Sequence, residues 1–94
     1  MEFEWDDMKA DSNLRKHGVR FTEAATIWLD PSSLETMSAD HVQGEERWIR
    51  VGISSHGRAL AVVYADLCEG ERVRIISARR ATFNERVFYK RGRL

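Results

Sequence analysis

Residues 47–65, which read RWIRVGISSHGRALAVVYA, contain the pattern that decides the fold class. Polar and apolar side chains alternate over Arg47–Ile53 at the period of two expected of a half-buried strand. One face of that strand carries Arg47, Ile49, Val51 and Ile53. Ser54–Gly57 has the composition of a hairpin turn, and Ala59–Ala65 is apolar on both faces, as expected of a central strand. The stretch therefore predicts two antiparallel strands joined by a short loop.

The same pattern continues toward the C-terminus. Residues 68–71 are expected to turn the chain. Arg72–Ala78 then alternates as a third strand, with Val73, Ile75 and Ser77 opposite Arg72, Arg74 and Ile76. Thr82 and Glu85 have the spacing of a capping box, in which each residue satisfies a backbone N–H at the start of a helix. We therefore expect a final helix that ends near Arg91.

The N-terminal region predicts a short strand followed by a helix. Phe3–Trp5 alternates as a strand, and Asp6 is suited to cap a helix over Asp7–Lys16 that Gly18 ends. The stripe that this helix presents at one face consists of Ala10, Asn13, Leu14 and His17. The polar side chains of Asn13 and His17 thus lie on the face of the helix that is expected to pack against the core.

A second helix follows directly. Thr22 is expected to open it, and its apolar stripe consists of Phe21, Ala24, Ala25 and Trp28. Asp30-Pro31 should end it, because proline lacks the N–H that a continuing helix needs. Beyond it, Leu34–Met37 is a candidate strand and Asp40–Glu46 a connection.

The order of these elements predicts an α+β fold. It has a mainly antiparallel sheet, two N-terminal helices and one C-terminal helix, and residues 1–94 form a single domain. The two faces of the meander differ in polarity, so we expect helices to cover one face. The basic groups should then gather at the other face or its rim.

Charge is divided unevenly along a chain whose net charge is zero. Residues 1–46 contain eleven acidic and four basic side chains, and residues 47–94 contain the reverse. Such a division favours a basic surface for a polyanion. The alternative is that the two halves neutralise each other across the fold, and composition alone does not separate these readings.

Composition also suggests where the protein acts. No apolar run approaches the roughly 20 residues that span a bilayer, and the acidic N-terminus differs from a secretory signal. The single cysteine, Cys68, has no partner for an internal disulfide. A cytoplasmic protein is expected.

Three segments carry a resemblance to a known family. They contain Phe3-Glu4-Trp5-Asp6 with Asn13-Leu14-Arg15-Lys16-His17-Gly18-Val19, then Glu46-Arg47, and finally Arg74 to Thr82 with Glu85-Arg86 and Tyr89. The chain resembles the BrnT toxins, a RelE-like group of type II toxin–antitoxin systems. The resemblance implies a RelE-like fold and an endoribonuclease that cleaves messenger RNA to arrest growth without a cofactor. It also implies a BrnA-type ribbon-helix-helix antitoxin as the partner. A dimer of this antitoxin would form a hetero-oligomer with the toxin, and the complex would contact operator DNA only through the antitoxin.

Cleavage of RNA by its own 2′-hydroxyl needs a base, cations for the developing charge and an acid for the leaving 5′-oxygen. No zinc-like spacing relates His17, His41, His56 and Cys68, so no metal site is predicted. The interpretation that follows is a metal-independent site built from arginines and proton-transferring side chains.

Four residues are the catalytic candidates: Arg79, Arg47, His17 and Tyr89. Arg79 precedes a capped helix and is suited to phosphate, and the alternative is an ion pair with Glu85. Arg47 either faces the site or pairs with an acid such as Glu46. His17 either acts as an acid, a base or a phosphate contact, or is a packed histidine that caps backbone carbonyls. Tyr89 is named because RelE-like toxins often use a C-terminal tyrosine, and the alternative is a packing role.

Five further residues are candidates for binding RNA: Lys16, Arg80, Arg50, Arg74 and Trp48. The cations would contact phosphates, and Trp48 would stack on a base, unless it belongs to the core. Whether Trp48 and Tyr64 lie on the same face of the sheet or on opposite faces depends on the strand register. The alternative function is a non-catalytic component of a DNA-binding repressor complex built with the antitoxin, which the absence of an obvious acid–base pair favours.

Overall fold

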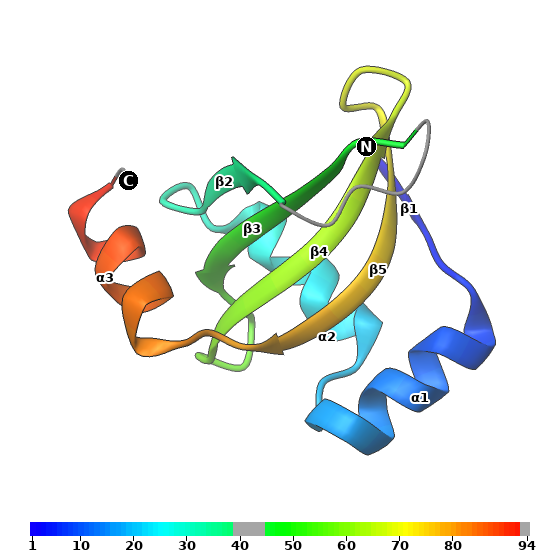
Figure 1. The fold of residues 1–94 in the computed structure, drawn as a ribbon, viewed down its shortest axis with the longest axis horizontal. Coiled ribbons are helices and arrows are strands. Elements are labelled where there is room, and N and C mark those ends of the chain that lie inside the picture. Colours follow the sequence, from blue (N-terminus) through cyan, green and yellow to red (C-terminus); the bar gives the residue numbers. More distant parts are fainter. Residues whose placement is uncertain (39–44, 93–94) are drawn as a thin grey trace.

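The computed structural model describes residues 1–38 and 45–92 (Figure 1). Its elements are β1 (Glu2–Glu4), α1 (Asp7–His17), α2 (Phe21–Ala25), the 3₁₀ helix η1 (Thr26–Leu29), β2 (Leu34–Met37), β3 (Arg47–Ile53), β4 (Ala59–Leu67), β5 (Arg72–Arg80) and α3 (Phe83–Arg91). The predicted α+β fold is confirmed. Most of the predicted Asp40–Glu46 connection, with His41, lies outside the described residues.

The strands form one five-stranded sheet in the order β1-β5-β4-β3-β2. The pairs β2–β3, β3–β4 and β4–β5 are antiparallel, as the hairpin pattern predicts, and β1 adds to β5 in parallel. The parallel pair was not anticipated from the sequence, because it joins segments about 70 residues apart. It brings the N-terminal strand beside the last strand.

The local signals at the helix ends behave as predicted. Asp6 accepts a hydrogen bond from the Lys9 N–H, Gly18 ends α1 with a φ of 68°, and Thr82 and Glu85 form the capping box of α3. Other boundaries differ. The second helix begins at Phe21 and tightens into η1, while β4 and β5 run two residues longer than predicted, to Leu67 and Arg80.

The main core lies between the sheet and the two N-terminal helices. It is a cluster of ten buried residues: Val19, Phe21, Ala24, Ile27, Leu60, Val62, Tyr64, Val73, Ile75 and Ala78. Trp28 lies at its border, with edge-on ring contacts to Phe3 at 5.1 Å and Tyr64 at 4.9 Å. Figure 1 shows α2 behind the sheet, on this face. We call it the covered face.

The last helix packs on the opposite face of the sheet. Phe88 and Tyr89 of α3 contact a small cluster that includes Val51 and Ala61, at the side of the sheet away from α1 (Figure 1). The expectation that helices cover only one face was therefore wrong. The two faces carry separate apolar patches, so α3 has its own surface to bury. We call this second face the open face, since α3 covers only part of it.

A β-bulge in β5 decides which face its last residues occupy. Val63 pairs with Ser77 and the next residue, Tyr64, pairs with Ile75, so Ile76 is an extra residue. Ser77 and Arg79 therefore leave the face of Ile75 and move to the open face. The predicted alternation, which placed Ser77 with Val73 and Ile75, was wrong. A bulge breaks the period of two wherever it inserts a residue.

Asn13 attaches α1 to the edge of the sheet. Its side-chain amide donates to the Ala78 carbonyl at 2.8 Å, and its amide oxygen accepts from the Ala78 N–H at 3.0 Å. The amide also donates to the Val19 carbonyl at 3.0 Å. This 95%-buried side chain satisfies backbone groups that an adjacent strand would otherwise satisfy. The polar position in the α1 stripe thus has a structural explanation.

Candidate functional site

Arg79 lies on the open face beside the start of α3. Its register partner is Ala61, which belongs to the cluster under α3. Its Nη1 and Nη2 atoms donate to the two carboxylate oxygens of Glu85 at 2.7 and 2.9 Å. This hydrogen bonding lowers the pKa of Glu85 and raises that of Arg79. The ion pair considered from the sequence is therefore present, and 36% of the Arg79 side chain remains exposed.

Arg47 and Arg74 form a second cationic group on the same face. Both residues are in register with Ala65, so they lie on either side of it. They share one carboxylate, since Glu45 is 3.5 Å from Arg47 Nε and 3.1 Å from Arg74 Nη1. Arg47 thus pairs with an acid, which was one of the two alternatives from the sequence, although that acid is Glu45 rather than Glu46.

The two groups do not converge on one point. Arg79 is opposite Ala61 and Arg47 is opposite Ala65, so they are separated by four residues, or about 13 Å, along β4. Between them lie the half-buried side chains of Ile49, Val63 and Ser77. The open face therefore offers an apolar centre with guanidinium groups at both ends. Such spacing suits an extended ligand with charges along its length.

Lys16 and His17 approach this face from the side of α1. Both are exposed at the C-terminal end of the helix, and both line a depression that also contains Ile76 and Ser77 of β5. His17 is exposed rather than packed, and no hydrogen bond joins it to a backbone carbonyl among the described residues. The structure therefore places these two side chains beside the strand that carries Arg79.

Three of the predicted RNA-binding residues lie elsewhere. Trp48 pairs directly with Tyr64 and packs against the main core, so these two aromatic residues share the covered face. Arg50 also points to the covered face, where it lies 5.1 Å from the Trp28 ring and donates to Ser33 at 2.8 Å. Arg80 is exposed and pairs with Leu60, which places it on the side opposite Arg79.

Tyr89 forms part of the attachment of α3. Its hydroxyl donates to Asp30 Oδ2 at 2.7 Å, and the same oxygen accepts from the Ile53 N–H at 2.9 Å. The hydrogen bond to Asp30 and burial together raise the pKa of Tyr89. The hydroxyl therefore keeps its proton at neutral pH and holds α3 against the loop before β2.

A buried carboxylate that sequence reasoning missed lies under the β3–β4 hairpin. Glu23, with a side chain only 4% exposed, accepts from Arg58 Nε at 2.9 Å and from Ser54 Oγ at 2.7 Å. Hydrogen bonds from Arg58, more than offsetting burial, lower the pKa of Glu23. Arg58 also donates to the Gly18 carbonyl at 3.2 Å, so the pair connects the hairpin with the end of α1. The Glu-Ala-Ala stretch on α2 gave no signal of this role.

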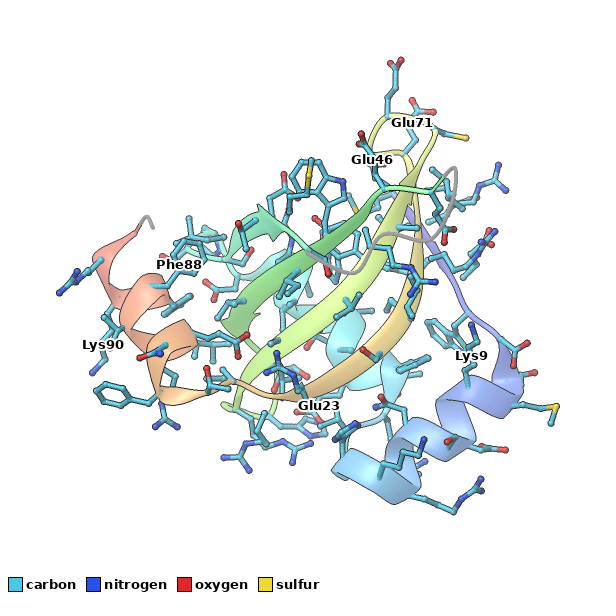
Figure 2. All side chains as sticks on the ribbon, in the orientation of Figure 1. Lys9, Glu23, Glu46, Glu71, Phe88 and Lys90 are labelled. Atoms are coloured by element: carbon cyan, nitrogen blue, oxygen red, sulfur yellow. The ribbon has the colours of Figure 1, made fainter. Side chains whose placement is uncertain are left out.

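Many of the ion pairs join the acidic first half of the chain to the basic second half. Except for Arg79–Glu85, every ion pair among residues 1–38 and 45–92 joins an acid of the first half to a cation of the second. Neutralisation across the fold therefore accounts for five arginines of the second half: Arg47, Arg50, Arg58, Arg72 and Arg74. Among the described residues, the lysines and arginines of α1 and α3 form no ion pair with an acid. Figure 2 shows the α1 residue Lys9 and the α3 residue Lys90 on opposite sides of the sheet.

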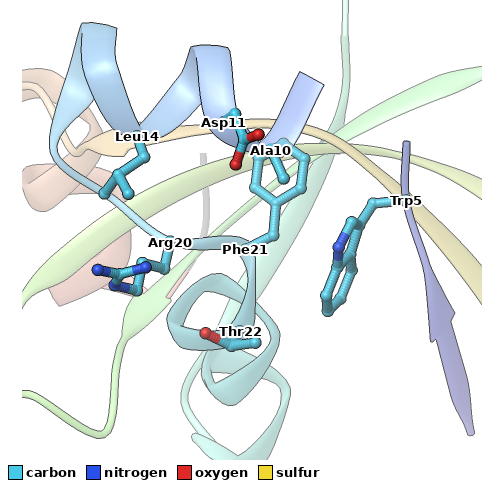
Figure 3. A pocket seen from close by; sticks show the side chains of 7 residues that line it. All are labelled: Trp5, Ala10, Asp11, Leu14, Arg20, Phe21 and Thr22. Carbon is cyan, nitrogen blue, oxygen red and sulfur yellow. The ribbon is translucent and has the colours of Figure 1, made fainter. Parts of the chain in front are cut away.

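Another hollow, of about 120 Å³, lies between α1 and α2 (Figure 3). Its walls include Trp5 and Phe21, whose rings meet edge-on at 6.0 Å, together with one acid and one base, Asp11 and Arg20. This is a junction between helices with no concentration of one charge. Within the described ranges, no three His, Cys, Asp or Glu side chains are arranged to hold a metal ion, and no helix is long and apolar enough to cross a membrane.

The fold is that of a small α+β protein with guanidinium groups on the open face of its sheet. Residues 5–85 match the family described as the ribonuclease toxin BrnT of type II toxin–antitoxin systems. The chain belongs to this family, as the motifs at both ends predicted. It is a ribonuclease toxin, and an antitoxin is its partner.

The solved structures include one with the same fold. The crystal structure of the Brucella abortus ribonuclease toxin BrnT superposes with a TM-score of 0.63 and 23% sequence identity, covering 87% of this chain and 97% of that one. This likeness confirms the arrangement of sheet and helices. A comparison with curated protein sequences gives no match.

Proposed function

We propose that this chain is a metal-independent endoribonuclease that cleaves messenger RNA in the cytoplasm and so arrests growth. The observation that best supports the proposal is the environment of Arg79. Its guanidinium lies on the open face and binds a carboxylate through two nitrogen atoms. A phosphate offers an arginine fork a similar pair of oxygens, so an RNA phosphate would take the place of Glu85.

The reaction follows from the chemistry of RNA. The 2′-oxygen of one nucleotide forms a bond to the adjacent phosphorus while the bond from phosphorus to the 5′-oxygen breaks. The products carry a 2′,3′-cyclic phosphate and a free 5′-hydroxyl, and one proton passes from the attacking to the leaving oxygen. Charge on the phosphoryl oxygens grows toward the transition state, where a fixed guanidinium stabilises it most.

The other candidates divide by position. His17 would transfer protons from the side of α1, since it lines a depression with Ile76 and Ser77 of the strand that carries Arg79, and Lys16 beside it would contact an RNA phosphate. Arg47 and Arg74 would bind RNA farther along the open face. We propose that Tyr89 tethers α3 rather than moving protons, because its hydroxyl is bound to Asp30.

The antitoxin would neutralise the toxin by covering the open face. We propose a BrnA-type antitoxin, whose ribbon-helix-helix dimer contacts operator DNA and joins the toxin in a hetero-oligomer. An acidic or amphipathic segment suits the apolar centre and the arginines at its two ends.

The direct test is cleavage of RNA by the purified chain. We expect a single-stranded RNA to be cut in the presence of a chelator, leaving 2′,3′-cyclic phosphate ends. The same sequence with 2′-O-methyl groups should remain intact, because its 2′-oxygens carry no proton to lose. An antitoxin encoded beside the toxin gene should abolish cleavage and restore growth. If RNA stays intact while the complex still binds operator DNA, the non-catalytic alternative is correct.

A further inference from the structure

A depression of about 190 Å³ lies where α1 meets the outer edge of β5. It is lined by Lys9, Ser12, Asn13, Lys16, His17, Ile76 and Ser77, and we call it the edge pocket. Every ionisable side chain in this lining is basic. Two serine hydroxyls add neutral hydrogen-bond donors.

The backbone explains why the sheet is accessible at this point. β1 pairs with β5 only as far as Arg74, and Asn13 occupies the strand edge at Ala78. The bulge at Ile76 falls between these two positions. The edge pocket thus lies over a short part of β5 that none of the described strands pairs with on this side, and α1 forms its outer wall.

The cations of the edge pocket have no acidic partners. Among residues 1–38 and 45–92, Lys9, Lys16 and His17 form no ion pair, whereas Arg47, Arg74 and Arg79 on the sheet all do. At about 100° per residue, the helix puts its two aspartates, Asp7 and Asp11, roughly opposite the two lysines. The positive charge of the pocket is therefore not cancelled from its own helix.

The pocket is also aligned with the proposed catalytic arginine. Ser77 and Arg79 both face the open side of β5, two residues or about 7 Å apart along the strand. That distance is comparable to the spacing of successive phosphates along a single RNA strand. A nucleotide held at Arg79 would thus direct its neighbouring phosphate toward the edge pocket.

We propose that the edge pocket binds an RNA phosphate next to the scissile one, with Lys9, Lys16 and Ser77 as its contacts. This inference rests on the proposed ribonuclease function. It adds Lys9 and Ser77 to the binding surface and gives the RNA a direction, from the open face past the β5 edge toward α1. A phosphate suits the pocket better than an isolated carboxylate, since its oxygens can bind two lysines and a hydroxyl together.

The test compares a double variant, Lys9→Gln with Lys16→Gln, against the control Arg15→Gln on the same helix. Arg15 is exposed and lies outside the pocket lining. Binding of a 2′-O-methyl single strand is measured over a range of salt concentrations. We expect the double variant to lose roughly tenfold in affinity, and about 0.7 in salt slope for one lost single-strand phosphate contact. Ser77→Ala should lose less, and the control should match the wild type.

Two further measurements separate the possible outcomes. The first is cleavage kinetics with cleavable RNA, in which KM should rise in the double variant by a larger factor than kcat falls. The second is an NMR titration with inorganic phosphate, which should shift the amide resonances around Ser77 in the wild type but not in the double variant. If the double variant binds RNA like the control while the wild type cleaves it, the edge pocket is refuted and the ribonuclease stands. If phosphate binds at the pocket but the wild type never cleaves RNA, the function fails instead. Loss of antitoxin affinity without loss of RNA affinity would overturn the proposal in favour of an acidic protein segment.

Discussion

Two of the arginine–carboxylate pairs in the molecule differ in burial. Under the β3–β4 hairpin, Glu23 is 4% exposed and binds both Arg58 and Ser54. At the rim of the open face, the Arg79 side chain is 36% exposed and the Glu85 side chain is 20% exposed. A buried charge depends on its partner, because no water can replace it. A partly exposed arginine at the rim can exchange a carboxylate for another anion at a lower cost, so the comparison predicts a structural role for the buried pair and permits the proposed role of Arg79.

The largest expected effect is on catalysis. Arg79→Ala should slow RNA cleavage by roughly a hundredfold or more, since it removes a donor to the transition-state charge. The melting temperature of the variant should fall by only a few degrees, because a partly exposed pair contributes on the order of 1 kcal/mol. Arg79→Lys should restore part of the rate, because lysine keeps the charge without the fork. RNA cleavage and thermal melting are measured on the same preparations.

Glu85→Ala is the matched control for that prediction. A merely structural Arg79–Glu85 pair would make both alanine variants lose stability, Glu85→Ala by more because it also removes the capping contact to the Thr82 N–H, and would leave cleavage by folded Arg79→Ala intact. Full activity in a stable Arg79→Ala protein would remove this residue from the site.

The buried pair should show the opposite behaviour. Glu23→Gln leaves Arg58 without its countercharge and should cost about 2–3 kcal/mol, somewhat below the range for fully buried pairs because Arg58 is 28% exposed. In a domain of this size that loss lowers the melting temperature by roughly 10–20 °C. Cleavage well below the new melting temperature should stay near the wild-type rate. Urea unfolding gives the free energy, and a variant with normal stability would contradict the structural role.

Acid should distinguish the pairs further. Because Arg58 lowers the pKa of Glu23 in the folded state, the pair stabilises the protein above the unfolded pKa of about 4.3. That stabilisation is lost as the pH falls through the lower, folded pKa. Stability measured between pH 7 and pH 3 should therefore fall less steeply in Glu23→Gln than in the wild type. Parallel curves would mean that Glu23 does not contribute to acid unfolding.

The smallest effect is expected at the attachment of α3. Tyr89→Phe removes the hydrogen bond to Asp30 and should cost about 1 kcal/mol. Cleavage should change by no more than a few-fold if Tyr89 acts only as a tether. A fall in the cleavage rate close to that of Arg79→Ala would instead indicate that Tyr89 is a catalytic residue. Urea unfolding and cleavage assays on one preparation decide between the two.

Much of the architecture follows from local sequence. The period-two alternation of Arg47–Ile53 and the apolar run of Ala59–Ala65 predicted the central hairpin, and Asp6, Gly18 and the Thr82–Glu85 box predicted the helix ends. These features depend on neighbouring residues alone, through strand pleating and capping hydrogen bonds. The family motifs, which include Arg79, also lie in continuous stretches and are visible without a structure.

The tertiary structure decided which residues meet and which face each occupies. Pairing of β4 with β5 creates the bulge at Ile76, and only that bulge places Arg79 on the open face with Glu85. The hydrogen bonds between Asn13 and Ala78, which are 65 positions apart, likewise form only when α1 lies beside β5. Strand register and partner choice arise from packing between distant segments, which local pattern does not encode. The sequence by itself therefore determined the elements and the family, and the fold determined which cations pair with acids among the residues that the structure describes.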